Sequence, residues 1–280
     1  MNTLLLDEFL KSYLAEDIGR GDVTTEAVFA EGEEGGAVFR AKENLVCVGM
    51  ERVAGRVFRL LDQRVRLDYS VADGTAVEAG AELLRVHGPV RALLTGERTA
   101  LNLVQRLCGI ATLTARFVAA AQGTKARISD TRKTTPGLRM LEKYAVLAGG
   151  GVNHRFNLAD GVLIKDNHIE ACGSIAEAVR KVRAAVPHTL RIEVEAENLE
   201  QVRECVEHRV DIIMLDNMDG PGMREAVEFI NGRALVEASG NMTLERIPEV
   251  AATGVDLISI GALTHSAGSR DISMDWLVQG

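Results

Sequence analysis

The segment DTRKTTPGLR, residues 130–139, concentrates positively charged side chains in a short stretch of the chain. It holds Arg132, Lys133 and Arg139 together with threonines, a proline and a glycine. The preceding KARIS (residues 125–129) is typical of the end of a short strand, so the cations and hydroxyls fall on the loop that leaves the strand. Guanidinium and ammonium groups pair with carboxylates and phosphates. The segment therefore indicates a pocket for a doubly charged or phosphorylated anion.

Two further clusters follow in GGGVNHR (residues 149–155) and LIKDNHI (residues 163–169), which add Arg155, Lys165 and two histidines. All three clusters lie within residues 130–169 of a chain whose net charge is −8. A solvated basic surface is the alternative interpretation of these residues.

The composition is that of a globular protein with an aliphatic core. Of the 280 residues, 46% are apolar, 26% charged and only 4% aromatic, which is enough for one large domain or two smaller ones. The excess of 40 acidic over 32 basic residues argues against a nucleic-acid or anionic-membrane partner. The chain has no run of 18 apolar residues, and its acidic N-terminus does not resemble a signal peptide. We expect a cytoplasmic protein that binds neither nucleic acid nor membrane.

The four cysteines suggest neither a metal site nor a disulfide framework. They are far apart in the sequence and form no CxxC pair. Reduced thiols in the core of a cytosolic protein are the simple interpretation, for Cys47, Cys108, Cys172 and Cys205.

The first part of the chain predicts an α/β sandwich domain over residues 1–110. Apolar residues at helical spacing over residues 6–14 predict a first helix that stops at IGRGD, and short strand-like runs follow up to residue 88. Residues 90–121 are helical in pattern, with Gly109 expected to separate two helices. The C-terminal tail, residues 268–280, alternates apolar residues and is expected to return as a strand onto this domain.

Residues 111–267 predict a catalytic domain in which strands and helices alternate. The strand candidates are ARIS, GVLIK, RIEVE, IIMLD, ALVEAS and LISIG. Two of the intervening helices have recognisable starts, at Ser174 with Glu177 and at Asn198 with Gln201. Apolar strands that alternate with helices indicate a parallel sheet covered on the outside.

The spacing of the strand ends favours an incomplete (β/α) barrel. Lys165, Glu195, Asp216, Ser239 and Gly261 end successive strands at intervals of 21 to 30 residues, with too few units for eight. A doubly wound sheet is the alternative, but GxGxxG is absent. In barrels this end of the strands carries the chemistry, and the last two loops often bind a phosphate. In this chain, backbone N–H groups in those two loops could bind a phosphate, and the N-termini of the following helices would add their dipoles. The residues are Ser239, Gly240, Asn241, Gly261 and Ala262.

Taken together, these motifs resemble the quinolinate phosphoribosyltransferase family. The similarity rests on DTRKTTPGLR, on LEKYAVLAGGGVNHRFNLADGVLIKDNHI, and on the later MLDNM and SGN. EDIGRGDVTT and GERTALNLVQRLCGIAT extend it nearly from end to end. Related proteins encoded in molybdenum-uptake operons share the fold but lack the complete TRKTTPG and IKDNH motifs. An anion-binding accessory protein of that branch is therefore the alternative from another functional class.

The resemblance implies a reaction and a site. Quinolinate and phosphoribosyl pyrophosphate would give nicotinate mononucleotide, pyrophosphate and CO₂, with Mg²⁺ as cofactor, in de novo NAD biosynthesis. Lys133, Lys165, Glu195 and Asp216 would be catalytic, and Glu195 and Asp216 would also hold the metal or the ribose hydroxyls. The full substrate-binding set would be Arg98, Thr131, Arg132, Lys133, His154, Arg155, Lys165, Glu195, Asp216, Ser239, Gly240, Asn241, Ile260, Gly261 and Ala262.

The resemblance also implies a homodimer with shared active sites. Arg98 lies before the barrel in sequence, yet it would reach a quinolinate carboxylate from a neighbouring subunit. A two-fold dimer would then contain two equivalent sites.

Several residues keep alternative interpretations. Lys165 could be the Schiff-base lysine of an aldolase-type barrel. Asp166 and His168 are expected to orient their loop and cap the next helix. Arg139 and Lys143 could contact substrate, or form a salt bridge or dimer contact. Glu193 shares a strand face with Glu195, which is preferred because it is nearer the strand end.

Overall fold

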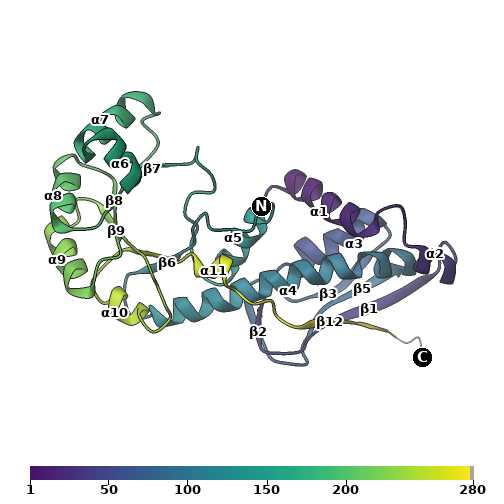
Figure 1. Ribbon diagram of the computed structural model, residues 1–280. Helices are drawn as coiled ribbons and strands as arrows, with labels where there is room; N and C mark the ends of the chain where they lie inside the picture. The colour runs from purple at the N-terminus through teal and green to yellow at the C-terminus, as the bar shows by residue number, and fades with distance from the viewer. Residues whose placement is uncertain (278–280) are drawn as a thin grey trace. The chain divides into compact units, whose positions relative to one another are not determined.

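A computed structural model describes residues 1–277 of the chain (Figure 1). The chain forms two compact units that are interleaved in sequence. The first contains Met1–Ala115, Thr135–Gly150 and the segment from Ala267 onward, and the second contains Arg116–Thr134 and Gly151–Ser266. We describe each unit by itself.

The first unit is built on a four-stranded antiparallel sheet of order β12-β1-β5-β3, with a separate β2-β4 pair. The strands are β1 (Glu34–Ala41), β2 (Leu45–Cys47), β3 (Arg66–Ser70), β4 (Thr75–Val77), β5 (Glu82–Pro89) and β12 (Ile272–Trp276). The helices are α1 (Thr3–Ile18), α2 (Val23–Val28), the π-helix η1 (Met50–Gly55), α3 (Arg56–Leu61), α4 (Val90–Ala120) and α5 (Arg139–Ala148).

The C-terminal strand β12 lies at the edge of this sheet. It runs antiparallel to β1, with Trp276 opposite Ala37 and Ile272 opposite Ala41. The rest of the predicted tail, residues 278–280, lies outside the described residues. The core beside the sheet is aliphatic with a few aromatic rings, among them Phe39 and Phe58, which meet edge to face at 6.0 Å.

Helix α4 is continuous, so the prediction that Gly109 separates two helices is wrong. A β-carbon at Gly109 would lie 2.0 Å from the carbonyl oxygen of Gly268. The glycine therefore allows close approach of another backbone segment, and it does not end the helix. A sequence pattern cannot distinguish these two uses of a glycine, because the partner segment is more than 150 residues away.

By length and composition alone, α4 is also the single helix of the described chain that could cross a membrane. Its most apolar window has a mean hydropathy of 1.2, and half of that window is buried inside the protein. Core helices of soluble proteins meet the same criterion, so this is weak evidence for a membrane span.

The second unit is an open parallel sheet with helices outside it. Six strands run in the order β6-β11-β10-β9-β8-β7, which confirms the prediction of an incomplete (β/α) barrel. The strands are β6 (Arg127–Ser129), β7 (Val162–Ile164), β8 (Ile192–Ala196), β9 (Ile212–Asp216), β10 (Leu235–Ser239) and β11 (Leu257–Ser259).

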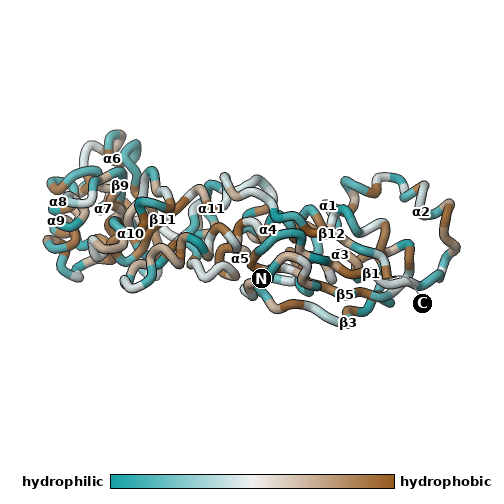
Figure 2. Tube along the Cα trace, turned by 90° about the horizontal axis from the view of Figure 1, so that it is seen from below, coloured by the Kyte–Doolittle hydropathy of each residue, from teal (hydrophilic) through white to brown (hydrophobic). Residues whose placement is uncertain are grey.

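Short and medium helices alternate with these strands, and α7–α10 lie along the outside of the sheet (Figure 1), whereas α11 borders the cavity described below. They are α6 (Asp166–Cys172), α7 (Ile175–Ala185), α8 (Leu199–Glu207), α9 (Gly220–Ile230), α10 (Ile247–Ala251) and α11 (Ala262–His265). Hydrophilic and hydrophobic residues alternate along α7–α9 (Figure 2), as expected of helices with one face on a sheet and one in water.

Two predicted helix starts are confirmed. The Ser174 hydroxyl accepts a hydrogen bond from the backbone N–H of Glu177, and Asn198 accepts one from Gln201. Each side chain satisfies one of the N–H groups that a helix leaves unpaired at its first turn.

Candidate active site

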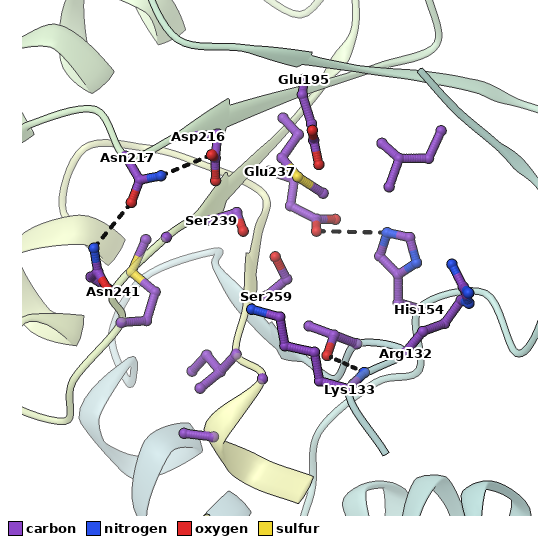
Figure 3. A pocket seen from close by; sticks show the side chains of 18 of the residues that line it. Arg132, Lys133, His154, Glu195, Asp216, Asn217, Glu237, Ser239, Asn241 and Ser259 are labelled. Carbon is purple, nitrogen blue, oxygen red and sulfur yellow. Dashed lines mark hydrogen bonds and ion pairs between the residues drawn. The ribbon is translucent and has the colours of Figure 1, made fainter. Parts of the chain in front are cut away.

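A cavity of about 830 Å³ opens at the carboxyl ends of the barrel strands (Figure 3). The predicted site residues of the second unit all line it: Thr131, Arg132, Lys133, His154, Arg155, Lys165, Glu195, Asp216, Ser239, Gly240, Asn241, Ile260, Gly261 and Ala262. The wall also contains residues that the sequence did not single out, including Met214, Asn217, Glu237, Ser259 and His265.

Arg98 is the one predicted site residue that does not line this cavity. It lies exposed on α4 in the first unit and makes no hydrogen bond or ion pair within residues 1–277. An exposed guanidinium without a partner in its own chain is compatible with a contact to another molecule, and its role remains a prediction.

The cationic loop after β6 is anchored by the fully buried carboxylate of Asp130. This carboxylate accepts hydrogen bonds from the Asn153 side chain, at 2.6 Å, and from the backbone N–H of His154, at 2.9 Å. Val152 bridges Ser129 in parallel, so the GGGVNHR segment lies along the free edge of β6. One buried acid therefore joins the two loops that carry Arg132 and Arg155.

Arg155 is partly buried beside a second guanidinium. Its Nη1 donates to the carbonyl oxygen of Gly161 at 2.8 Å. Burial lowers the pKa of Arg155, and the charge of Arg132 lowers it further. Two arginines close enough to repel each other in a shielded position indicate a site for an anion with more than one negative charge.

On the other side of the cavity, carboxylates project from the strand ends. Glu195 is the second-to-last residue of β8 and forms an ion pair with Lys165, and Asp216 ends β9. The Asp216 carboxylate accepts a hydrogen bond from Asn217 at 2.8 Å, and Asn217 in turn accepts one from Asn241 at 3.2 Å (Figure 3). These acids and amides form a polar part of the cavity wall that is suited to binding hydroxyl groups or a hard cation.

The last two barrel loops pack tightly and expose backbone donors. A β-carbon at Gly240 would lie 2.2 Å from the Asn217 side chain, and one at Gly261 would lie 2.8 Å from the Lys133 side chain. Within residues 1–277, no backbone carbonyl accepts a hydrogen bond from the backbone N–H groups of Gly240, Asn241, Gly261 and Ala262. Such free N–H groups are suited to phosphate oxygens.

The expected helix N-terminus is absent directly after Asn241, whereas a short helix does begin at Ala262 in the last loop. Helix α10 begins only at Ile247, well after Asn241, and α11 has four residues. Neither helix brings a long row of aligned peptide dipoles to the loop, so the backbone N–H groups themselves remain as the anion donors.

Lys133 lies in the cationic loop after β6, and its backbone is held against helix α11. The Thr264 hydroxyl donates to the backbone carbonyl of Lys133 at 2.7 Å, and the Lys133 side chain is exposed in the cavity (Figure 3). Its ammonium group therefore lies between the cationic loop and the phosphate-type loops.

The structure bears on three of the residues that keep alternative interpretations. Lys143 is 0% exposed within the first unit, so it is structural. His168 accepts a hydrogen bond from the backbone N–H of Lys165 at 3.0 Å, which confirms its role at the start of α6. The Lys165 ammonium is engaged by Glu195.

Glu193 and Glu237 are the acids that sequence reasoning missed or set aside. They are 4% and 1% exposed, and one oxygen of each has no hydrogen-bond partner within residues 1–277. His154 Nε2 lies 3.0 Å from Glu193 and 3.7 Å from Glu237. The sequence does indicate that both glutamates face the site. Each lies two residues before a predicted site residue on the same strand, and residues two apart on a strand share a face.

Comparisons with known proteins agree with this geometry. The N-terminal and C-terminal domain models of quinolinate phosphoribosyl transferase match residues 22–108 and 110–275. A probable nicotinate-nucleotide pyrophosphorylase (carboxylating) of Bacillus subtilis is 48% identical over 275 residues, covering 98% of this chain and 94% of the relative. A mitochondrial quinolinate phosphoribosyltransferase (decarboxylating) of Nicotiana tabacum is 42% identical, covering 96% of this chain and 81% of its own length.

A solved structure gives the same result. The crystal structure of NadC from Streptococcus pyogenes superposes with a TM-score of 0.94 at 42% identity, and the match covers 99% of each chain.

Proposed function

This chain belongs to the quinolinate phosphoribosyltransferase family, and from that membership we propose that it joins quinolinate to a phosphoribosyl group. The second substrate is phosphoribosyl pyrophosphate, and the products are nicotinate mononucleotide, pyrophosphate and CO₂. This is a reaction of de novo NAD biosynthesis.

The observation that carries the proposal is the division of one cavity into two chemically different sides. Arg132 and His154 lie on one side, with Arg155 beside Arg132, and the strand-end residues Glu195 and Asp216 lie on the other. Quinolinate has two adjacent carboxylates and phosphoribosyl pyrophosphate has hydroxyls and phosphates. We refer below to the quinolinate side and the phosphoribosyl side.

On the quinolinate side, the guanidinium groups of Arg132 and Arg155 bind the two carboxylates. Arginine suits a carboxylate because its planar fork can donate two parallel hydrogen bonds. Asp130 holds both loops in place from behind, so the cations do not need to reorganise when the substrate enters.

On the phosphoribosyl side, Asp216 and Glu195 bind the ribose hydroxyls. Gly240, Asn241, Gly261 and Ala262 donate backbone N–H groups to the 5-phosphate. Lys133 binds the pyrophosphate group, whose negative charge increases as it leaves.

Magnesium fits the donor set of the phosphoribosyl side. Among the described residues, one carboxylate oxygen of Asp216 accepts no hydrogen bond, whereas the Glu195 oxygen Oε1 is paired with Lys165. Hard carboxylate oxygens with substrate phosphates are the usual ligands of Mg²⁺. When bound, the ion would neutralise charge on the pyrophosphate. Asp216 is therefore the primary protein ligand in this proposal, with Glu195 as the second.

The transfer develops positive charge on the ribose carbon that the pyridine nitrogen attacks. The carboxylates of Glu195 and Asp216 stabilise this charge from the ribose side. After transfer the ring nitrogen is quaternary and withdraws electrons from ring carbon 2, which favours loss of the 2-carboxylate as CO₂.

We further propose a cytoplasmic homodimer in which Arg98 of each subunit completes the other subunit's quinolinate side. The exposed, unpartnered position of Arg98 on α4 supports this.

The experiment is a product assay on the purified protein with quinolinate, phosphoribosyl pyrophosphate and Mg²⁺. The proposal expects nicotinate mononucleotide and pyrophosphate in equal amounts, and no product when any one substrate is omitted. Absence of nicotinate mononucleotide with all components present would overturn it.

A further inference from the structure

Glu237 occupies an unusual place in the cavity. It lies in the middle of β10 at 1% exposure, between strands β9 and β11, yet it contributes to the cavity wall. In Figure 3 its carboxyl group lies between the strand-end acids and His154. It is therefore at the boundary between the phosphoribosyl side and the quinolinate side.

Within residues 1–277, the carboxyl group of Glu237 forms no ion pair with a lysine or an arginine. Its oxygen Oε1 has no hydrogen-bond partner in that part of the chain. A carboxylate oxygen of Glu193 and the His154 imidazole each offer an atom within 4.8 Å of it. Two buried carboxyl groups at this separation do not both ionise readily, so one of them keeps its proton.

The hydrogen bonds of His154 decide which acid keeps the proton. Its Nδ1 accepts the backbone N–H of Arg155 at 2.9 Å, so the ring proton is on Nε2, which donates to Glu193 at 3.0 Å. Glu193 therefore receives the hydrogen bond of His154, and Glu237, at 3.7 Å from the same nitrogen, does not. Burial and the Glu193 charge raise the pKa of Glu237 to about 7, against smaller opposing contributions of His154 and Ser259, while Asp130 raises it slightly.

The same hydrogen bonds argue against a metal ion at His154, Glu193 and Glu237, although their ligand atoms lie within 4.8 Å of one another. With Nδ1 used as an acceptor and Nε2 protonated, the imidazole has no lone pair left for a metal. A neutral acid beside a carboxylate explains the cluster with the atoms present.

The proposed reaction requires a proton at this boundary. The pyridine nitrogen must face the ribose carbon, so it lies where the two sides meet, and the adjacent ring carbon 2 lies there too. When the bond between carbon 2 and its carboxylate breaks, CO₂ leaves and the electron pair stays on carbon 2. A proton must then form the new C–H bond.

We propose that Glu237 is the acid that donates this proton. This inference rests on the proposed function. The O–H bond of Glu237 breaks, the proton binds to carbon 2, and the resulting Glu237 carboxylate takes a proton from water before the next turnover. The acid thus acts only after phosphoribosyl transfer, in the decarboxylating half of the reaction.

The test separates the two halves of the reaction in a Glu237→Gln variant. Glutamine keeps the shape and a polar group but has no acidic proton. In a single-turnover assay, pyrophosphate release should stay within about threefold of wild type, whereas nicotinate mononucleotide formation should fall about 10²- to 10⁴-fold, so that quinolinate mononucleotide accumulates. Glu225→Gln, an exposed residue of α9, is the matched control and should leave both rates unchanged.

Three results would overturn the inference and leave the proposed function intact: equal losses in both steps, no loss in either, or a stoichiometric metal ion in wild type that only Glu237→Gln removes. A wild-type protein that forms no nicotinate mononucleotide would instead overturn the proposed function.

A second measurement on wild type covers the case of a variant that does not fold. The groups that face Glu237 are Glu193, His154, Asp130 and Ser259. The decarboxylation step should slow as pH rises through about 7, while pyrophosphate release does not. A decarboxylation rate that is constant from about pH 6 to pH 9 would contradict the assignment.

Discussion

The two sides of the cavity are positioned by different kinds of structure. On the phosphoribosyl side, Glu195, Asp216 and Ser239 stand at the ends of consecutive parallel strands, and the β-ladder fixes their spacing. On the quinolinate side, Arg132 and Arg155 lie on irregular loops that depend on side-chain hydrogen bonds to Asp130. The repeat of the barrel therefore positions one half of this site, and one buried acid positions much of the other half.

The largest expected effect concerns the number of cations on the quinolinate side. Nicotinate has one carboxylate, so its binding would leave a buried cation without a partner, which is strongly unfavourable. We expect kcat/KM for nicotinate to be lower than for quinolinate by about 10⁴-fold. Steady-state assays with each acid at saturating phosphoribosyl pyrophosphate measure this ratio, and comparable values would show that the second carboxylate is not recognised.

The anchoring role of Asp130 gives the next effect. In Asp130→Asn, one acceptor becomes an NH₂ group that faces N–H donors, so the loops of Arg132 and Arg155 shift. The quinolinate KM should rise about 10²-fold, the typical effect of misplacing binding groups by an ångström. The KM for phosphoribosyl pyrophosphate should change less than threefold.

The kinetics of the Asp130→Asn variant also test whether the quinolinate side and the phosphoribosyl side are positioned independently. A rise of both KM values by the same factor would mean that the two sides are not positioned independently. The thermal unfolding midpoint of the variant, measured alongside, shows whether the fold is retained.

The phosphoribosyl side was largely predictable from the sequence, and the quinolinate side was predictable only through its motif. Regular strand spacing places Glu195, Asp216 and Ser239 at one edge without any knowledge of family. By contrast, nothing in the spacing of residues 130 and 154 predicts that Asp130 binds the backbone of His154, since that contact joins two irregular loops.

Glycine and glutamate positions show what a local pattern cannot decide. Gly109 was expected to break a helix, but it serves a contact with Gly268 that is remote in sequence. Glu237 interrupts an apolar strand, and only the neighbouring strand and the loop of His154 show that it is a buried acid at the cavity.

A smaller effect concerns the proposed dimer, in which Arg98 of the neighbouring subunit would complete the quinolinate side. Arg98→Ala and Arg155→Ala proteins should each be nearly inactive, and a mixture of exchanging subunits should recover about one quarter of the wild-type rate, because half of the dimers are mixed and each has one intact site. Activity assays and sedimentation of the mixture measure this. An active monomer, or no recovery after subunit exchange, would refute the shared site.

The smallest effect concerns the helices outside the barrel. Ser174→Ala removes the hydrogen bond to the Glu177 N–H and should lower the free energy of unfolding by about 1 kcal/mol. Denaturant unfolding measures the loss, and Ser174→Thr, which keeps a hydroxyl, should recover most of it. Neither KM should change, because the cap is remote from both sides; a change in one KM would show that α7 helps to position that side.

The division of the cavity is tested most directly by calorimetric titration of quinolinate into two variants without phosphoribosyl pyrophosphate. Arg132→Ala should raise the Kd about 10²-fold, since a charge-assisted carboxylate contact contributes about 1.5–3 kcal/mol. Asp216→Asn should change the Kd less than threefold while its turnover falls about 10²-fold or more. Equal losses of quinolinate affinity in the two variants would contradict the account.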